Sequence, residues 1–112
     1  MKKISVGVMM YNEEKNLPHI LECITRQTRK NYVFDELVLI SDGSSDGTNN
    51  LIKSFQCPKI GRIKKCIFKK RAGKYSRINS FIKISRNSIL FLLSADILFP
   101  LDTFDKLIKS FD

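Results

Sequence analysis

The sequence has few of the residues that metal-binding or disulfide-bonded proteins need. It contains three cysteines and one histidine in 112 residues, and no two cysteines have CxxC spacing. An odd number of cysteines without such spacing provides neither a disulfide framework nor a zinc site. We therefore expect Cys23, Cys57 and Cys66 to be incidental reduced thiols, because a free cysteine behaves as a small hydrophobic residue.

Long hydrophobic segments are also absent. The longest apolar run, residues 89–93, is far shorter than the roughly 18 residues of a membrane-spanning helix. Residues 1–4 lead into strand-like sequence without the apolar region and cleavage site of a secretory signal. These features predict a cytoplasmic protein. The length and the 43% hydrophobic content predict a single domain over residues 1–112.

Acidic residues are missing from the middle of the chain. Between Gly47 and Ala95 there is no aspartate or glutamate, although twelve lysines and arginines occur and the whole chain carries a net charge of +9. This segment predicts an electropositive surface, suited to nucleic acid, an anionic membrane or a phosphorylated small molecule. Charge alone does not choose among these.

Strand-like and helix-like segments alternate along the chain. Apolar runs typical of strands are followed by polar turns and then by apolar residues at helical spacing. The expected strands cover residues 4–10, 36–40, 63–68 and 88–93, and the expected helices lie around residues 17–24, 51–55, 78–85 and 104–111. This alternation predicts an α/β, Rossmann-like and mostly parallel sheet in the order 3-2-1-4, with helices on both faces.

Polar clusters follow each expected strand. Residues 11–14 follow the first, residues 42–46 the second, Lys70 and Arg71 the third, and Asp96 the fourth. Because ligands bind outside the carboxyl ends of parallel strands, one crevice would hold an aromatic ring, carboxylates and cations. An aromatic face suits a nucleobase, and cations with a carboxylate-held metal suit a diphosphate. The pattern therefore favours a nucleoside-diphosphate ligand.

Each cluster also has a purely structural interpretation. Residues 42–48 are typical of an Asx turn with a helix cap, and residues 11–14 of a helix N-terminus whose acids meet the dipole. Residues 69–71 could form a solvated loop, and Asp96 could be a plain loop acid. Only the combination at one sheet edge favours a binding site.

Together, four segments resemble the family 2 glycosyltransferases. They are Tyr11-Asn12-Glu13-Glu14, Ser41 to Thr48, Arg71-Ala72-Gly73-Lys74 with Asn79, and Ser94-Ala95-Asp96, in matching order and spacing. Four motifs in register over essentially the whole chain make the resemblance specific. It implies a GT-A fold that binds a nucleoside-diphosphate sugar, usually a UDP-sugar, for inverting transfer of the sugar to an acceptor.

The resemblance also implies roles for single residues. Tyr11 and Asp42 would contact the base, with Glu13 supporting that pocket. Arg71 and Lys74 would approach the diphosphate.

The segment from Ser94 to Asp96 corresponds to the family's DxD-like motif. Ala95 and Asp96 would belong to the nucleotide-sugar site, and Asp96 would hold Mn²⁺ or Mg²⁺. The metal would act as a Lewis acid that neutralises charge on the departing nucleoside diphosphate. Ser94 stands where the family usually has aspartate, which weakens the expected metal site.

The chain is short for the family, whose catalytic domains place the acceptor site and the general base in a further part. An inverting transfer needs that base to deprotonate the acceptor hydroxyl. Asp102, Asp105 and Asp112 lie on or around a terminal helix that we expect to cover the sheet instead. The sequence thus predicts a truncated donor-binding half that is not fully active alone.

The alternative from another class is a non-catalytic nucleotide-binding or basic nucleic-acid-binding module. The latter would use Lys64, Lys65, Lys69, Lys70 and Arg71. Thin aromatic interleaving and the lack of a recognition motif disfavour nucleic acid. Expected partners are instead a nucleotide-sugar donor, an unidentified sugar or lipid acceptor, the membrane surface for a longer form, and a second copy at an exposed sheet edge.

Overall fold

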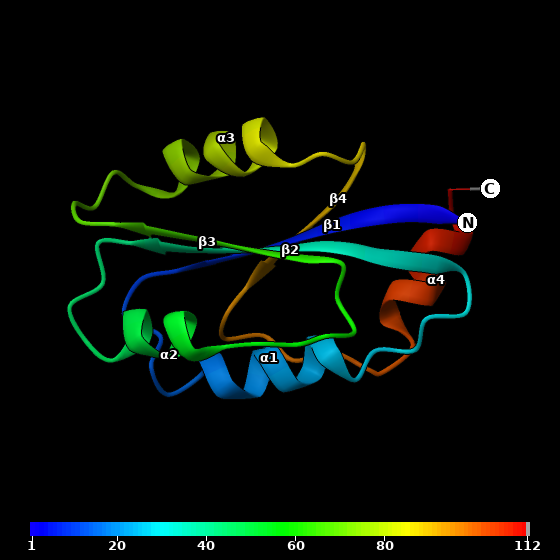
Figure 1. Ribbon diagram of the computed structural model, residues 1–112, viewed down its shortest axis with the longest axis horizontal. Helices are drawn as coiled ribbons and strands as arrows, with labels where there is room; N and C mark the ends of the chain where they lie inside the picture. The colour runs from blue at the N-terminus through cyan, green and yellow to red at the C-terminus, as the bar shows by residue number, and fades with distance from the viewer. Residues whose placement is uncertain (112) are drawn as a thin grey trace.

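The computed structural model describes residues 1–111 and contains one four-stranded parallel sheet with helices on both faces (Figure 1). The strands are β1 (Lys2–Met10), β2 (Tyr32–Asp42), β3 (Arg62–Phe68) and β4 (Ile89–Ser94). The helices are α1 (Leu17–Thr25), α2 (Thr48–Ser54), α3 (Lys74–Ile84) and α4 (Thr103–Lys109). The strand order β3-β2-β1-β4 confirms the order expected from the sequence.

The second strand is longer than its apolar run suggested. It begins at Tyr32, whereas the sequence placed its start at Glu36. Asp35 and Glu36 are buried in the strand because each has a cationic partner, Arg86 at 2.6 Å and Lys64 at 2.9 Å. Paired charges thus allow the strand to continue where single carboxylates would be costly to bury.

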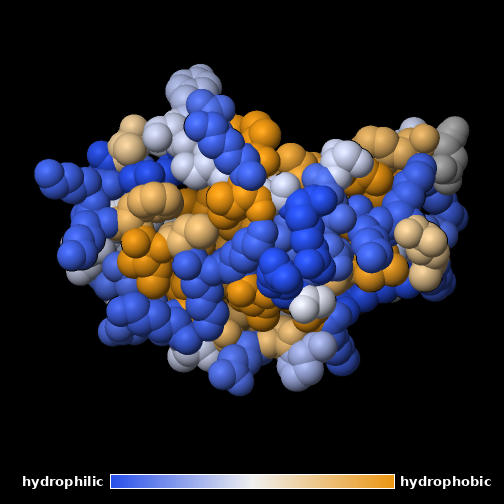
Figure 2. Space-filling model, turned by 45° about the horizontal axis from the view of Figure 1, so that its top comes forward, coloured by the Kyte–Doolittle hydropathy of each residue, from blue (hydrophilic) through white to orange (hydrophobic). Residues whose placement is uncertain are grey.

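The two faces of the sheet are covered unequally. Helices α1 and α2 lie on one side and α3 lies on the other (Figure 1). Helix α3 approaches β1 closely at Gly7, where an added Cβ would lie 2.8 Å from the Phe81 ring. Viewed from the α3 side, hydrophilic side chains surround several apolar patches (Figure 2). The small core under α3 centres on Val38, Ile40 and Phe81, and the larger core lies on the opposite face.

Helix α4 lies beside the N-terminus of β1, away from the carboxyl ends of β2 and β3 (Figure 1). The Phe104 ring packs against four other aromatic rings, those of Tyr32, Phe34, Phe91 and Phe99. The expectation that the terminal helix covers the sheet therefore needs a refinement, because α4 covers the amino end of the sheet. Asp112 lies outside the described residues.

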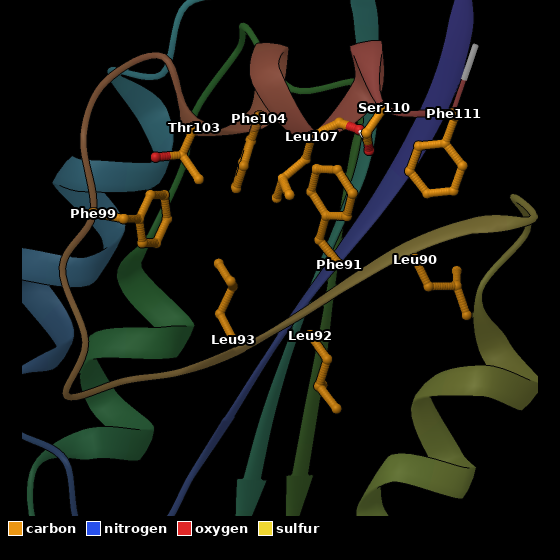
Figure 3. A pocket seen from close by; sticks show the side chains of 10 residues that line it. All are labelled: Leu90, Phe91, Leu92, Leu93, Phe99, Thr103, Phe104, Leu107, Ser110 and Phe111. Atoms are coloured by element: carbon orange, nitrogen blue, oxygen red, sulfur yellow. Dashed lines mark hydrogen bonds between the residues drawn. The ribbon is translucent and has the colours of Figure 1, made fainter.

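Beside β4 there is a hollow of about 340 Å³ whose lining is almost entirely apolar (Figure 3). Phe91, Phe104 and Leu107 point into it from β4 and α4, and Thr103 and Ser110 are its polar residues. Leu92 and Phe111 at this hollow are 40% and 57% exposed. The lack of charged groups makes it unsuited to a nucleotide.

Two further features bear on the sequence expectations. None of the helices within residues 1–111 combines the length and hydrophobicity needed to cross a bilayer. Cys23, Cys57 and Cys66 are free and partly buried.

Candidate nucleotide-binding site

A second hollow, lined by both polar and apolar residues, lies where β1, β2 and β4 end and α3 begins. Its volume is about 190 Å³. Its lining residues are Met9, Met10, Tyr11, Asp42, Arg71, Lys74, Arg77 and Ser94. This is the edge at which parallel sheets bind ligands. Because whole ligand pockets usually have roughly 300–1,000 Å³, the hollow suits one part of a nucleotide, with the rest on the open surface.

Four of the predicted residues come together there: Tyr11, Asp42, Arg71 and Lys74. The guanidinium of Arg71 lies 4.0 Å from the centroid of the Tyr11 ring. A cation over an aromatic face is attracted by the ring quadrupole. The aromatic ring and the cations predicted for base and diphosphate are therefore neighbours.

Asp42 is held from several directions. Its Oδ1 accepts hydrogen bonds from the Ala72 N–H at 2.8 Å and from Arg77 Nε at 2.7 Å, and its Oδ2 accepts one from the Gly73 N–H at 3.0 Å. Burial by itself raises the pKa of Asp42, but these hydrogen bonds and the Arg77 charge outweigh it and lower the pKa. Asp42 is therefore an ionised carboxylate, which only accepts hydrogen bonds.

A glycine allows the loops after β2 and β3 to meet. Gly43 has φ +75°, a conformation that residues other than glycine rarely adopt. A Cβ added there would lie 2.6 Å from the backbone nitrogen of Arg71. The Gly43 N–H also donates to the Phe68 carbonyl at 3.1 Å. This close approach brings Arg71 beside the end of β2.

The loops after β1 and β2 are joined by side-chain hydrogen bonds. Asn12, with φ 53°, accepts hydrogen bonds through Oδ1 from the N–H groups of Ser45 at 2.8 Å and Asp46 at 3.3 Å. Asp46 in turn accepts hydrogen bonds from the N–H groups of Glu14 at 3.2 Å and Thr48 at 2.9 Å. The structural interpretation of the 42–48 segment thus applies to Asp46, whereas Asp42 faces the hollow.

Three predicted residues are not among the lining residues. Glu13 Oε2 accepts a hydrogen bond from Asn16 Nδ2 at 2.8 Å, which holds the side chain at the start of α1. Ala95 is buried, and Asp96 is exposed in the turn that follows β4. Asp96 nevertheless follows closely on Ser94, which does line the hollow. The roles of all seven residues remain predictions.

The donor set for a metal ion is small. Within residues 1–111 no three histidine, cysteine, aspartate or glutamate side chains gather in a metal-binding arrangement. Mg²⁺ is often held by one or two carboxylates together with substrate phosphates and water. Asp96 alone therefore fits an ion that shares its coordination with a diphosphate.

The sequence reasoning missed Arg77, which lines the hollow and pairs with Asp42. One signal could have revealed it. Arg77 is four residues before Phe81 and so lies on the buried face of α3, where a cation needs a partner.

The fold is an α/β sheet with helices on both faces, and the hollow at its strand ends gathers an aromatic ring, a carboxylate and three cations. The sequence model of Glycosyl transferase family 2 matches residues 5–112, and the chain belongs to this family. The undecaprenyl-phosphate 4-deoxy-4-formamido-L-arabinose transferase of Photorhabdus laumondii is 31% identical over 97% of this chain and 34% of its own length. The corresponding protein of Aeromonas hydrophila is 28% identical over 97% of this chain and 33% of its own length. The chain thus spans about a third of these curated relatives.

Solved structures share the fold. S. aureus TarS 1-349 in complex with UDP-GlcNAc superposes with a TM-score of 0.80 at 21% identity, over 97% of this chain and 30% of that one. The mannosyltransferase PcManGT from Pyrobaculum calidifontis, in complex with GDP-Man and Mn²⁺, gives a TM-score of 0.80 at 23% identity, over 96% and 31%.

Proposed function

We propose that the chain binds a nucleoside-diphosphate sugar and forms the donor-binding part of an inverting glycosyltransferase. The observation that carries this proposal is the hollow at the strand ends. It combines the aromatic face of Tyr11, the ionised carboxylate of Asp42, and the cations Arg71 and Lys74. These groups match a base, a ring N–H or ribose hydroxyl, and a diphosphate.

The charge state of Asp42 narrows the choice of base. An ionised carboxylate needs a donor opposite it, and uracil and guanine carry a ring N–H where cytosine and adenine carry an acceptor. The proteins in the TarS and PcManGT structures are bound to UDP-GlcNAc and GDP-Man, and both bases fit this requirement. We propose a UDP-sugar as the donor.

Asp96 would hold Mn²⁺ or Mg²⁺ against the diphosphate. When bound, the ion would neutralise charge on the departing nucleoside diphosphate. Arg71 and Lys74 would add positive charge and orient the two phosphates. Tyr11 would hold the base by stacking.

The site for the acceptor would lie in the part of the relatives that this chain does not span. The curated relatives are named as undecaprenyl-phosphate transferases, which supports a lipid-phosphate acceptor and a place at the cytoplasmic membrane face. The nucleic-acid alternative loses support because two of its lysines are engaged. Lys64 pairs with Glu36 at 2.9 Å, and Lys65 Nζ donates to the Lys53 carbonyl at 2.8 Å.

Calorimetry with UDP and with uridine, each with and without Mn²⁺, tests the proposal. We expect UDP to bind more tightly than uridine, and Mn²⁺ to strengthen UDP binding only. Equal binding of the two ligands would argue against a diphosphate site. Absence of binding to either would overturn the proposed function.

A further inference from the structure

Arg77 is a buried cation at the centre of the site. Only 8% of the residue is exposed. Its Nε donates to Asp42 Oδ1 at 2.7 Å, and its Nη2 donates to the Lys70 carbonyl at 2.8 Å. Its guanidinium lies 3.5 Å from the centroid of the Phe68 ring. The end of β2, the end of β3 and the loop before α3 therefore all fix this one side chain.

We propose that Arg77 is a positioning residue that aims the Asp42 carboxylate at the base of the bound nucleotide. This inference rests on the proposed function. A carboxylate has about four acceptor positions on its two oxygens. Ala72, Gly73 and Arg77 occupy three of them, two on Oδ1 and one on Oδ2. The remaining position is on Oδ2 and is left for the ligand.

The geometry explains why a fork-shaped cation is used. The guanidinium of Arg77 holds Asp42 and the Lys70 carbonyl at once, and the Phe68 ring limits its movement. A lysine at this position would supply a point charge without the planar fork. Arg77 thus restricts rotation of the Asp42 carboxylate, so that a misplaced donor gains little.

The positive charge of Arg77 is not its main contribution to the site. Arg71, Lys74 and Tyr11 also face the hollow with Asp42, from the loops after β3 and β1 and from α3. The hydrogen bonds from the Ala72 and Gly73 N–H groups would still favour the ionised carboxylate if Arg77 were neutral. The direction of the carboxylate is what Arg77 adds, and recognition of the base N–H is the property that reports it.

The matched control is the ion pair between Arg86 and Asp35. Arg86 Nε lies 2.6 Å from Asp35 Oδ2, and a second Arg86 nitrogen donates to Oδ1 at 2.7 Å. Neither Arg86 nor Asp35 lines the hollow at the strand ends. Arg86→Met therefore removes a similar pair without touching the proposed site.

The test titrates the 112-residue chain with UDP and with N3-methyl-UDP, which lacks the ring N–H. The parent should prefer UDP by about 10- to 100-fold, the usual value of a hydrogen bond to a charged group. Arg77→Met should reduce this preference to less than about threefold, and Arg77→Lys should leave an intermediate preference. Arg86→Met should keep the parent preference.

Circular dichroism and thermal unfolding establish that each variant is folded. If Arg77→Met does not fold, Arg77→Lys decides the question in the same titration. An unchanged preference in a folded Arg77 variant would overturn the positioning role while leaving the proposed function intact. A parent chain that binds no UDP would overturn both.

Discussion

The guanidinium of Arg71 lies 4.0 Å from the centroid of the Tyr11 ring, so the residue predicted for the diphosphate covers the residue predicted for the base. A cation–π contact at such an exposed site contributes about 0.5–1 kcal/mol. A charge-assisted hydrogen bond to phosphate contributes about 1.5–3 kcal/mol. The difference favours movement of Arg71 from the ring to the diphosphate when the nucleotide binds.

Arg71→Ala should therefore weaken UDP more than uridine. We expect UDP affinity to fall about 10- to 100-fold, because one charge-assisted contact is lost. Uridine affinity should change by less than about threefold. Uridine has no phosphate for Arg71 to bind, so only the weak contact between Arg71 and the Tyr11 ring is lost. Calorimetry with both ligands measures the two changes.

Lys83→Ala is the matched control for charge. Lys83 is an exposed cation in the last turn of α3 and does not line the hollow. Its loss lowers the net charge equally and should leave UDP affinity within about twofold, because exposed charges at a distance are screened. Equal weakening by both variants would show that the basic segment acts only as a diffuse field.

Removal of the proposed metal ligand should abolish the effect of Mn²⁺ on UDP binding. Asp96→Asn keeps the size of the side chain and removes the charge that would hold the ion. UDP affinity in Mn²⁺ should then fall to the metal-free value, while uridine is unaffected. Asp102→Asn serves as the control, because Asp102 is an acid at the N-cap of α4 that pairs with Lys106 at 3.2 Å. A Mn²⁺ effect that persists in Asp96→Asn would place the metal ligand elsewhere.

The arrangement of the sheet was predictable because its signals are local. Each strand is an apolar run that ends in a polar turn, and strands alternating with helices leave few topologies. The Gly43 turn brings Arg71 to the hollow by a close backbone contact, which the sequence does not show. The position of Tyr11 and Asp42 at neighbouring strand ends followed from the strand order alone.

The partners of the buried charges were not predictable, since each partner lies far away in the sequence. The spacing of Arg77 from Phe81 indicates that Arg77 lies on the buried face of α3, but only its pairing with Asp42 explains how a charge is accommodated there. Likewise, Asp35 lies just before the strand expected at residues 36–40, and its place inside β2 depends on its ion pair with Arg86. Whether a charged residue is buried depends on contacts between residues far apart in the sequence. The periodicity of apolar residues gives no information about these contacts.

Asp105 should make folding stability depend on pH. Its carboxylate accepts hydrogen bonds from the N–H groups of Lys30 and Asn31 at 3.0 and 2.9 Å and from the Thr28 hydroxyl at 2.5 Å. Burial raises the pKa of Asp105, but these hydrogen bonds outweigh it and lower the pKa. The contribution to stability is therefore present above the unfolded pKa of about 4 and is lost as pH falls through the folded pKa.

Asp105→Asn tests this contribution by urea unfolding at several pH values. At pH 7 we expect a loss of about 1–3 kcal/mol in the free energy of unfolding, because the charge-assisted hydrogen bonds are weakened. The difference from the parent should shrink as pH is lowered from about 4 toward 2. Asp102→Asn, at the N-cap of the same helix, should cost less than about 1 kcal/mol, because its ion pair with Lys106 is exposed. A pH-independent difference would mean that the charge of Asp105 has no part in stability.

The last prediction concerns the base that an inverting transfer requires. The carboxylate that lines the hollow at the strand ends is Asp42. Its lowered pKa makes it a weak base at neutral pH. An efficient general base has a pKa near the working pH, and its absence costs about 10²–10⁴-fold in rate. The 112-residue chain should therefore release UDP from UDP-GlcNAc slowly, by hydrolysis, and at a rate that does not depend on an added acceptor. The assay measures UDP release with and without a polyprenyl phosphate, and Asp96→Asn serves as a control for metal-assisted departure. Acceptor-dependent release at roughly 1 s⁻¹ or faster would show that this chain itself supplies the base and the acceptor site.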